Sequence, residues 1–332
     1  MQAIQKIINS NNCSVDTRTL RKDEIFFDLG SKSNKDGDYF FKALKKKPLF
    51  IITQNQKRKL SGKNFIIVKN IYSFYVKSIS QKFKKKPKYK VAVTGTNGKT
   101  SVAFFYYRIL NLLGIKVGSI GTLGVFENLK KSKGNLTTPD FFSNHKSLNH
   151  FYKKRINHSI IEASSHGLKQ SRLEKIDFDC GVFTNLTHDH LDYHKTMKDY
   201  LNSKLILFKK LIKKNGFLVT GSEVLEFPLL NKISKKNKLN LLSYGRKGNI
   251  IKIISSKPDG QFTKLKINIL GKVHSLKLKL IGNFQIENFL AATLACYSSG
   301  ISFEKIFRIC SRIGNPPGRL QLFKKKKQNR YY

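Results

Sequence analysis

Short apolar runs alternate with amphipathic stretches over most of the chain. The apolar runs lie at residues 91–94, 159–162, 178–183, 217–220 and 241–244, and helical periodicity occupies residues 101–113, 141–154, 197–213 and 283–299. Strands separated by helices of this length form right-handed crossovers, so the pattern predicts a mostly parallel sheet. Residues 250–280 instead alternate apolar and polar positions around Pro258, which predicts an antiparallel meander at the sheet edge.

The N-terminal part repeats this alternation on a smaller scale. Apolar runs at residues 49–52 and 65–68 predict strands, and the apolar residues near the N-terminus have helical spacing. A lysine-rich segment with Pro87 follows, as is typical of a linker. We therefore expect an α/β protein with a small N-terminal domain at residues 1–86 and a central domain at residues 87–314.

The composition adds a formal net charge of +44 over 332 residues. Basic faces bind nucleic acids, so a basic nucleic-acid-binding module is an alternative function. However, the basic residues are mostly lysines, and they are spread through every segment together with asparagine, isoleucine and phenylalanine, which share A/T-rich codons. Biased base composition therefore explains the charge, and we expect no specific nucleic-acid partner.

Cysteine usage and hydropathy bear on the compartment. The four cysteines lie far apart and form no C-x-x-C pair, which argues against a disulfide framework or a zinc ribbon and fits a reducing cytoplasm. No apolar run approaches the roughly 18 residues that a membrane-spanning helix needs, and the N-terminus lacks a signal-peptide core. We expect a cytoplasmic monomer without membrane insertion.

A glycine-containing turn joins the strand at residues 91–94 to the helix that follows. Glycines allow positive φ and the close approach of a phosphate, whose charge is then met by backbone N–H groups and the helix N-terminus. In such a loop the lysine contacts the β- and γ-phosphates and the following threonine binds Mg²⁺. The turn therefore predicts a nucleotide-binding loop, made of Gly95, Thr96, Asn97, Gly98, Lys99, Thr100 and Ser101.

Polar residues follow the strand at residues 159–162. In α/β sheets ligands gather beyond the carboxyl ends of the strands, so Glu162 can contact a Mg²⁺ ion that Thr100 holds. Ser164, Gln170 and Arg172 come next and are suited to a polar, anionic substrate.

The strand at residues 178–183 precedes a run rich in histidine and aspartate. A dinuclear metallo-hydrolase is an alternative there, because its H-x-H-x-D-H signature matches His188, His190 and Asp192. That signature requires histidine at position 193, where Tyr193 stands. Of the histidines in this run, His190 is the candidate metal ligand. Lys204, on the next predicted helix, has the features of a solvated surface residue.

Five segments together resemble the Mur ligases, and they lie at residues 95–100, 118–124, 136–140, 162–172 and 185–194. The resemblance runs from about residue 16 to residue 323. It implies an ATP-dependent, ADP-producing ligase that forms an amide bond between a diamino acid and UDP-MurNAc-L-Ala-D-Glu in peptidoglycan precursor synthesis. The expected diamino acid is meso-diaminopimelate, and L-lysine is the alternative.

The resemblance also implies roles for individual residues. ATP would be bound by residues 95–101 together with Asn288 and Arg319, and residues 31–37 would complete a uridine site. The residues that would hold the UDP-linked substrate are Val15, Thr17, Thr137, Thr138, Ser164, Gln170 and Arg172. The catalytic residues would be Lys99, Glu162, His190 and Lys204, with Lys204 carrying a carbamate.

Carbamylation would matter because it replaces a cation that repels Mg²⁺ with a carboxylate that binds it. Thr100 and Glu162 would then hold one Mg²⁺ ion, and His190 and carbamylated Lys204 the other. The implied reaction begins when a substrate carboxylate attacks the γ-phosphate to give an acyl phosphate. The amine of the diamino acid then displaces phosphate.

Two departures from the family pattern affect these expectations. Gln285 stands where the family usually has asparagine, which weakens the adenine contact assigned to Asn288. We expect the family's Rossmann-like C-terminal domain to be missing after Phe323, so that residues 315–332 form its truncated start and Arg319 lies at the junction. A frameshift or sequencing error at the lysine codons 324–327 would explain the ending. We expect nucleotide and UDP-sugar binding with little or no ligation from the chain as given.

Overall fold

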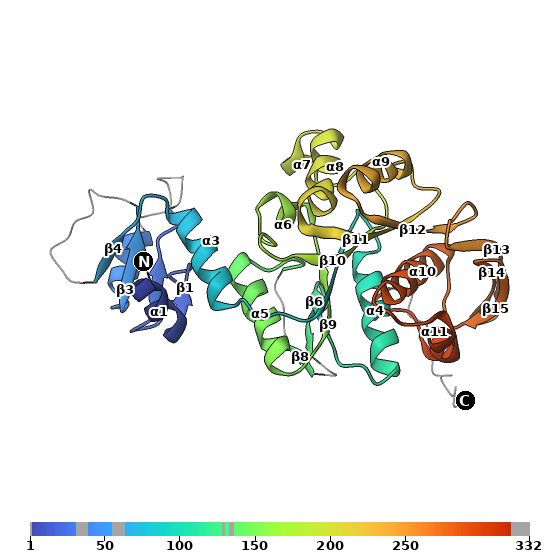
Figure 1. The fold of residues 1–332 in the computed structure, drawn as a ribbon, viewed down its shortest axis with the longest axis horizontal. Coiled ribbons are helices and arrows are strands. Elements are labelled where there is room, and N and C mark those ends of the chain that lie inside the picture. Colours follow the sequence, from blue (N-terminus) through green and yellow to red (C-terminus); the bar gives the residue numbers. More distant parts are fainter. Residues whose placement is uncertain (1, 31–38, 55–63, 128–129, 133–135, 320–332) are drawn as a thin grey trace, which may run out of the picture. The chain divides into compact units, whose positions relative to one another are not determined.

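The computed structural model describes residues 2–30, 39–54, 64–127, 130–132 and 136–319. The chain divides into two compact units, residues 1–84 and residues 85–332 (Figure 1). Two of the expectations above, the uridine loop at residues 31–37 and most of the truncated domain start at residues 315–332, lie outside the described residues.

The first unit is the expected small α/β fold. Its strands pair in parallel in chain order. Phe26, Phe40 and Ile51 form its buried core. The helix after the last strand was not predicted, and it begins where the Asn70 side chain accepts a hydrogen bond from the backbone N–H of Ser73. The elements are α1 (Gln2–Ser10), β1 (Cys13–Ser14), β2 (Ile25–Phe27), α2 (Tyr39–Leu44), β3 (Phe50–Thr53), β4 (Phe65–Ile67) and α3 (Ile71–Lys82).

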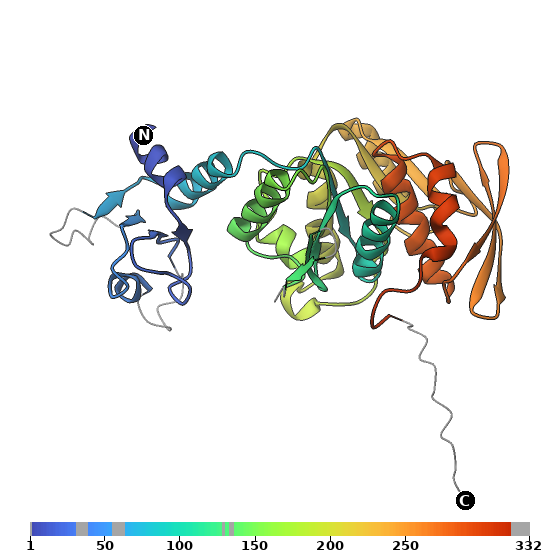
Figure 2. The ribbon, with the colours of Figure 1, turned by 90° about the horizontal axis from the view of Figure 1, so that it is seen from below.

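The second unit is built on one large sheet with the strand order β15-β14-β13-β12-β11-β10-β5-β9-β6-β7-β8. The strands from β12 through β6 pair in parallel, and β13–β15 form the expected antiparallel meander at one edge, which stands beside the last helices of the chain in Figure 2. The strands are β5 (Tyr89–Thr94), β6 (Val117–Gly121), β7 (Gly124–Glu127), β8 (Lys130–Ser132), β9 (His158–Glu162), β10 (Phe178–Phe183), β11 (Ile212–Gly221), β12 (Asn240–Gly245), β13 (Ile251–Asp259), β14 (Phe262–Ile269) and β15 (Lys272–Leu278).

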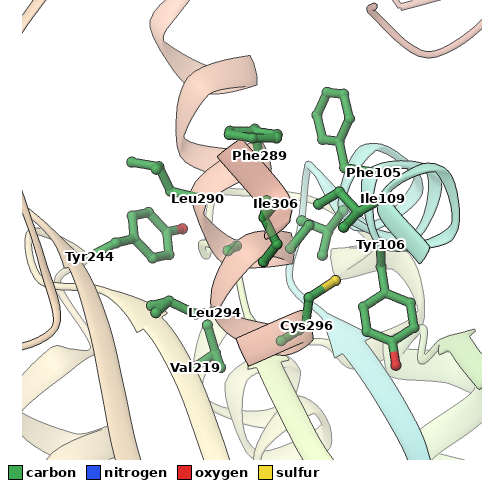
Figure 3. Close-up of a cluster of buried hydrophobic side chains, with 14 of the residues drawn as sticks. Phe105, Tyr106, Ile109, Val219, Tyr244, Phe289, Leu290, Leu294, Cys296 and Ile306 are labelled. Atoms are coloured by element: carbon green, nitrogen blue, oxygen red, sulfur yellow. The ribbon is translucent and has the colours of Figure 1, made fainter. Parts of the chain in front are cut away.

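Helices cover both faces of this sheet, because successive side chains of a strand point to opposite sides. Val91 and Val93 of β5 pack with the helices on one face, whereas Ala92 faces the cluster on the other. On the first face the core lies between two long helices, with Phe105 of one packed edge-to-face on Phe289 of the other (Figure 3). The helices are α4 (Lys99–Leu112), α5 (Phe141–Lys153), α6 (Ser165–Lys169), α7 (Leu191–His194), α8 (Met197–Ile206), α9 (Phe227–Asn237), α10 (Asn283–Tyr297) and α11 (Phe303–Ile309). None of the described helices is long and apolar enough to cross a membrane.

Two details differ from the expected elements. The helix predicted at residues 197–213 ends at Ile206, and a π-helical turn at Leu207–Leu211 leads directly into β11. Helical periodicity continues past this point, but pairing of Ile212 with Phe178 of β10 draws the chain into the sheet. The antiparallel hairpin of β6 and β7 at the other sheet edge was also not predicted.

Candidate functional site

The loop between β5 and α4 requires glycine at two positions. Gly98 has φ of 89° at the helix N-cap, and Gly95 has φ of 146°. A Cβ atom on Gly95 would lie 1.9 Å from Thr184 Oγ1, and one on Gly98 would lie 2.4 Å from Asn288 Oδ1. The loop is held by Asn185, which accepts hydrogen bonds from the backbone N–H groups of Thr96 and Asn97, each at 2.9 Å. The sequence therefore predicts this strand, turn and helix correctly.

Lys99 lies folded over this loop. Its ammonium group donates hydrogen bonds to the carbonyl oxygens of Gly95 at 2.9 Å and Thr96 at 2.7 Å. Burial lowers the pKa of Lys99, the carboxylates of Glu162 and Asp189 raise it, and the charge of Arg319 lowers it further. Arg319 is thus close enough to influence the loop, although its own side chain is exposed.

Glu162 at the end of β9 joins the loop to the β6–β7 turn. Its carboxylate accepts hydrogen bonds from Thr100 Oγ1 at 2.9 Å, from the backbone N–H of Thr122 at 2.9 Å and from Thr122 Oγ1 at 3.1 Å. The residue is 1% exposed, and burial raises the pKa of its carboxyl while these hydrogen bonds lower it. The structure therefore brings together Thr100 and Glu162, the two residues expected to share one Mg²⁺ ion.

Lys204 is buried, although the sequence pattern alone suggests a solvated lysine. The residue is 1% exposed, and its Nζ atom donates a hydrogen bond to Gly95 O at 2.8 Å. The Nζ atom also lies 4.1 Å from the centre of the Tyr200 ring. Burial, together with the charge of Lys99, lowers the pKa of Lys204 from 10.5 to about 6. At neutral pH the amine is therefore mostly uncharged, the form that can add CO₂.

A second group of predicted residues forms a polar surface beside Glu162. Thr138 Oγ1 donates a hydrogen bond to Glu162 O at 2.7 Å and accepts one from the backbone N–H of Ser164 at 2.9 Å. Arg172 donates to Thr138 O at 2.7 Å and, through Nε and one terminal nitrogen, to Gln170 Oε1 at 2.9 and 2.6 Å. Thr137 Oγ1 lies 3.0 Å from Thr122 Oγ1. All of these predicted residues thus lie together at the carboxyl end of β9.

His190 is placed differently. It precedes α7 with φ of 53°, its side chain is 47% exposed, and its backbone N–H donates to Asp189 Oδ1 at 2.9 Å. The ring lies 4.9 Å from that of His166, and no hydrogen bond between described residues joins His190 to Lys204. His194 is instead buried, with Nδ1 3.3 Å from Ser203 Oγ.

The oxygen atoms of Thr100 and Glu162 are suited to a Mg²⁺ ion that is bound together with a nucleotide. Among the described residues, no group of three or more His, Cys, Asp or Glu side chains is arranged to hold a metal ion. Mg²⁺, however, is commonly held by one or two protein oxygens, with nucleotide phosphates and water completing its coordination. Thr100 and Glu162 supply oxygen donors of that kind next to a phosphate-type loop.

Asn288 on α10 lies against the loop, because its Oδ1 atom is the closest contact of a Cβ built on Gly98. Its Nδ2 atom donates a long hydrogen bond of 3.4 Å to Gln285 Oε1. The Gln285 side chain is fully buried, and its Nε2 atom has no partner among the described residues. The departure at position 285 therefore changes the surroundings of Asn288.

In the first unit, Thr17 is buried and Val15 is half-buried. They flank Asp16, whose carboxylate accepts hydrogen bonds from the Arg18 side chain at 2.7 to 3.1 Å. These bonds lower the pKa of Asp16. The turn is thus ordered by its own residues.

Residue-level reasoning missed Thr122 and Tyr200. Thr122 follows β6 directly, and the rule that ligands gather beyond strand ends would have found it had that strand been recognised. Tyr200 precedes Lys204 by four residues and therefore lies on the same face of α8.

Comparison with known proteins gives concordant results. The family description "Mur ligase middle domain" matches residues 93–296. A UDP-N-acetylmuramoyl-L-alanyl-D-glutamate–2,6-diaminopimelate ligase from Rickettsia montanensis is 33% identical over 314 residues, which cover 93% of this chain and 65% of the relative. The chain thus spans about 65% of the length of that relative.

Solved structures resemble the fold. The structure of a UDP-N-acetylmuramoyl-L-alanyl-D-glutamate–2,6-diaminopimelate ligase matches with a TM-score of 0.80 at 24% identity, covering 95% of this chain and 65% of that one. A MurF ligase from Thermotoga maritima in complex with ADP matches with a TM-score of 0.71 at 19% identity, covering 96% of this chain and 70% of that one.

Proposed function

Because the chain belongs to the Mur ligase family, we propose that it acts in the ATP-dependent ligation of meso-diaminopimelate to UDP-MurNAc-L-Ala-D-Glu. This step builds a peptidoglycan precursor and releases ADP and phosphate. The choice of diaminopimelate is supported by the relative from Rickettsia montanensis, which is named for that amino acid. L-Lysine is the alternative diamino acid.

One observation carries the proposal. The glycine loop, the Thr100–Glu162 hydrogen bond and two lysines that share Gly95 O form one continuous cluster at the carboxyl ends of β5 and β9. A phosphate-binding loop alone would suit many nucleotide-binding proteins. A buried, largely uncharged lysine beside the loop is a much less common addition.

The protein's own groups account for much of the chemistry. Both reactants, ATP and a carboxylate, are anionic, so the main tasks are to neutralise charge and to align the attacking oxygen with the γ-phosphate. Lys99 and the loop N–H groups would neutralise the phosphates after Lys99 leaves the two carbonyl oxygens that it contacts here. Arg172 and Ser164 would hold the substrate's peptide part.

We further propose that Thr100 and Glu162 hold Mg²⁺ with the nucleotide, and that Lys204 carries a carbamate that holds a second ion together with His190. Bound Mg²⁺ supplies neutralisation of the charge on the transferred phosphate. Lys204 has the uncharged amine that carbamylation requires. His190 would have to turn toward Lys204, because its ring is half-exposed and contacts His166.

The remaining assignments belong to the same proposal. Residues 1–86 would bind the UDP-sugar, with Val15 and Thr17 in the site. Residues 87–314 would bind ATP, with Asn288 in the site and Arg319 added from the segment that follows. Residues 315–332 would begin a third domain. ATP and the UDP-linked substrate are both nucleotides of the cytoplasm, where we place a monomeric enzyme.

Binding measurements test the proposal on the 332-residue chain. Isothermal titration should detect ADP with Mg²⁺ and, separately, UDP-MurNAc-L-Ala-D-Glu. Lys99→Ala should weaken ADP binding and leave the sugar nucleotide unaffected. A wild-type chain with affinity for neither ligand would refute the proposal, and tight, steeply salt-dependent DNA binding in their place would favour a nucleic-acid-binding module.

Ligation assays decide the amino acid and the role of Lys204. In an enzyme completed with the family's third domain, tripeptide formation with meso-diaminopimelate but not L-lysine is the expected result, and the reverse preference would select the alternative. In the same completed enzyme, Lys204→Ala should reduce the rate by about 10²–10³-fold, by analogy with the loss of one transition-state contact. Rescue by short carboxylic acids would support the carbamate, whereas unchanged activity would exclude it.

A further inference from the structure

Tyr200 lies one helical turn before Lys204 on α8, and its side chain is fully buried. The hydroxyl group donates a hydrogen bond to Thr96 Oγ1 at 3.2 Å. The ring supports the Lys204 amine, whose Nζ atom lies 4.1 Å from the ring centre. One side chain therefore contacts both the phosphate loop and the buried lysine.

The Thr96 hydroxyl depends on Tyr200 for a complete set of hydrogen bonds. A hydroxyl can accept two hydrogen bonds and donate one. Thr96 Oγ1 accepts from the backbone N–H of Thr187 at 3.0 Å and from Tyr200, and it donates to Thr187 O at 3.3 Å. Without Tyr200, one acceptor position in the loop would have to find another donor.

The contacts form a closed circuit. Tyr200 bonds to Thr96, which is covalently joined to Gly95. The Gly95 carbonyl accepts a hydrogen bond from Lys204, and the Lys204 amine returns to the Tyr200 ring. The spacing of four residues keeps Tyr200 and Lys204 on one face of α8. A shift of the loop relative to the helix would therefore disturb every member of the circuit.

We propose that Tyr200 is a positioning residue that fixes the phosphate loop and the Lys204 amine relative to each other, so that nucleotide binding and the carbamate depend on the same side chain. This inference rests on the proposed function, because it assumes that the loop binds ATP and that Lys204 carries the carbamate. The hydroxyl acts on the loop and the ring acts on the lysine. The two parts can be separated by substitution.

Two substitutions and one control test the proposal. Tyr200→Phe keeps the ring and removes the hydroxyl, whereas Tyr200→Leu removes both. Tyr106→Phe is the matched control, because it deletes the hydroxyl of another fully buried tyrosine of the same unit, seven residues beyond Lys99 on α4. Each chain is assayed for ADP affinity by titration calorimetry and for the carbamate by ¹³C NMR after addition of ¹³C-bicarbonate. Neither measurement requires ligase activity.

Tyr200→Phe should weaken ADP binding by about 3- to 10-fold, as expected for one hydrogen bond, and keep the carbamate signal. Tyr200→Leu should weaken ADP binding at least as much. It should also raise by about 10-fold or more the bicarbonate concentration that gives half of the maximal carbamate NMR signal, because the loss of a residue that orients a ligating group has effects of that size. Tyr106→Phe should change neither quantity.

Wild-type values for both quantities in Tyr200→Phe and Tyr200→Leu would overturn the inference and leave the proposed function standing. If Tyr200→Leu does not fold, the ADP affinity of Tyr200→Phe decides alone, and an unchanged affinity overturns the inference. Equal losses in Tyr106→Phe would also overturn it, because they would show a general effect of removing buried hydroxyls. A wild-type chain that binds no ADP would overturn the inference, and one that binds neither ADP nor UDP-MurNAc-L-Ala-D-Glu would overturn the proposed function as well.

Discussion

Replacing Lys204 by methionine should make the protein more stable at neutral pH. Lys204 is 1% exposed, and burial lowers its pKa from 10.5 to about 6. The unfolded chain binds this proton at pH 7.5 and the folded chain does not. Releasing it three pH units below the ordinary pKa costs about 4 kcal/mol at 1.36 kcal/mol per unit. Methionine has a similar length and no proton to lose.

Part of this gain is offset. Lys204→Met removes the hydrogen bond from Nζ to Gly95 O, which is worth about 1 kcal/mol. Gly95 O keeps its hydrogen bond from Lys99 at 2.9 Å, so the carbonyl is not left without a donor. The expected net gain at pH 7.5 is therefore about 3 kcal/mol, from the terms for proton release and for the lost hydrogen bond.

The dependence on pH identifies the cause. Between about pH 6 and 10.5, the unfolded wild-type chain holds one more proton at Lys204 than the folded chain. Its free energy of unfolding therefore rises with pH relative to that of Lys204→Met, by about 1.4 kcal/mol per unit. The advantage of Lys204→Met should be largest at about pH 6 and below, and it should shrink steadily as the pH rises toward 10.5.

Urea denaturation from pH 7 to 9.5 in CO₂-free buffer measures this difference. The chain has no tryptophan, so circular dichroism is the suitable probe. Lys209→Met, which removes an exposed lysine near the end of the same helical segment, is the control and should follow the wild type at every pH. Parallel pH profiles for wild type and Lys204→Met would show that Lys204 keeps its proton on folding, and the reasoning would be wrong.

Three further substitutions probe the rest of the site. Glu162→Gln removes one of the carboxylate oxygens that accept hydrogen bonds from Thr100 and Thr122. The affinity for ADP in the presence of Mg²⁺, measured by calorimetry, should therefore fall by about 10- to 100-fold. An equal loss of ADP affinity with EDTA present would contradict a metal role for Glu162. Gly98→Ala should lower the melting temperature more than Gly300→Ala. Both glycines have φ near 90°, but of the two only Gly98 has a close neighbour, Asn288 Oδ1, where the new Cβ atom would lie. Equal decreases in melting temperature would show that the contact with Asn288 does not contribute. Arg172→Gln should weaken the binding of UDP-MurNAc-L-Ala-D-Glu by about 10- to 100-fold, as expected when hydrogen bonds from a charged group are lost, and leave ADP affinity unchanged. A loss of affinity for both ligands would indicate misfolding.

The sequence predicts the parallel core of the fold well and its edges less well. β5, β9 and β10 are short apolar runs between amphipathic helices, and this local pattern needs no tertiary information. The end of α8 was misplaced because periodicity alone does not show where pairing with β10 begins. The hairpin of β6 and β7 was missed because three of its strand residues are glycines, which carry no hydrophobic signal.

The same distinction applies to the site. Thr100 and Glu162 could be placed near each other from the sequence, because Thr100 comes just after one parallel strand, Glu162 ends another, and both strands end at the same edge. Lys204 could not, since a lysine on a predicted helix is ordinarily exposed. A signal was nevertheless present: Tyr200, four residues before Lys204, and Leu207, three residues after it, share its helix face, and both are buried. The family resemblance was needed to assign it a function.

It is unfavourable for Lys99 and Lys204 to be protonated, and so positively charged, at the same time, because both amines lie within hydrogen-bond distance of Gly95 O. Burial disfavours the charged form of Lys204 most, and two ammonium groups this close would also repel by on the order of 3 kcal/mol at an effective dielectric constant of about 20, so Lys204 is the one that gives up its charge. A carbamate on Lys204 would reverse the interaction and set an anion beside the Lys99 ammonium. Bicarbonate should therefore raise the melting temperature of the wild type and leave that of Lys204→Met unchanged. An equal rise in both chains would assign the effect to salt and not to Lys204.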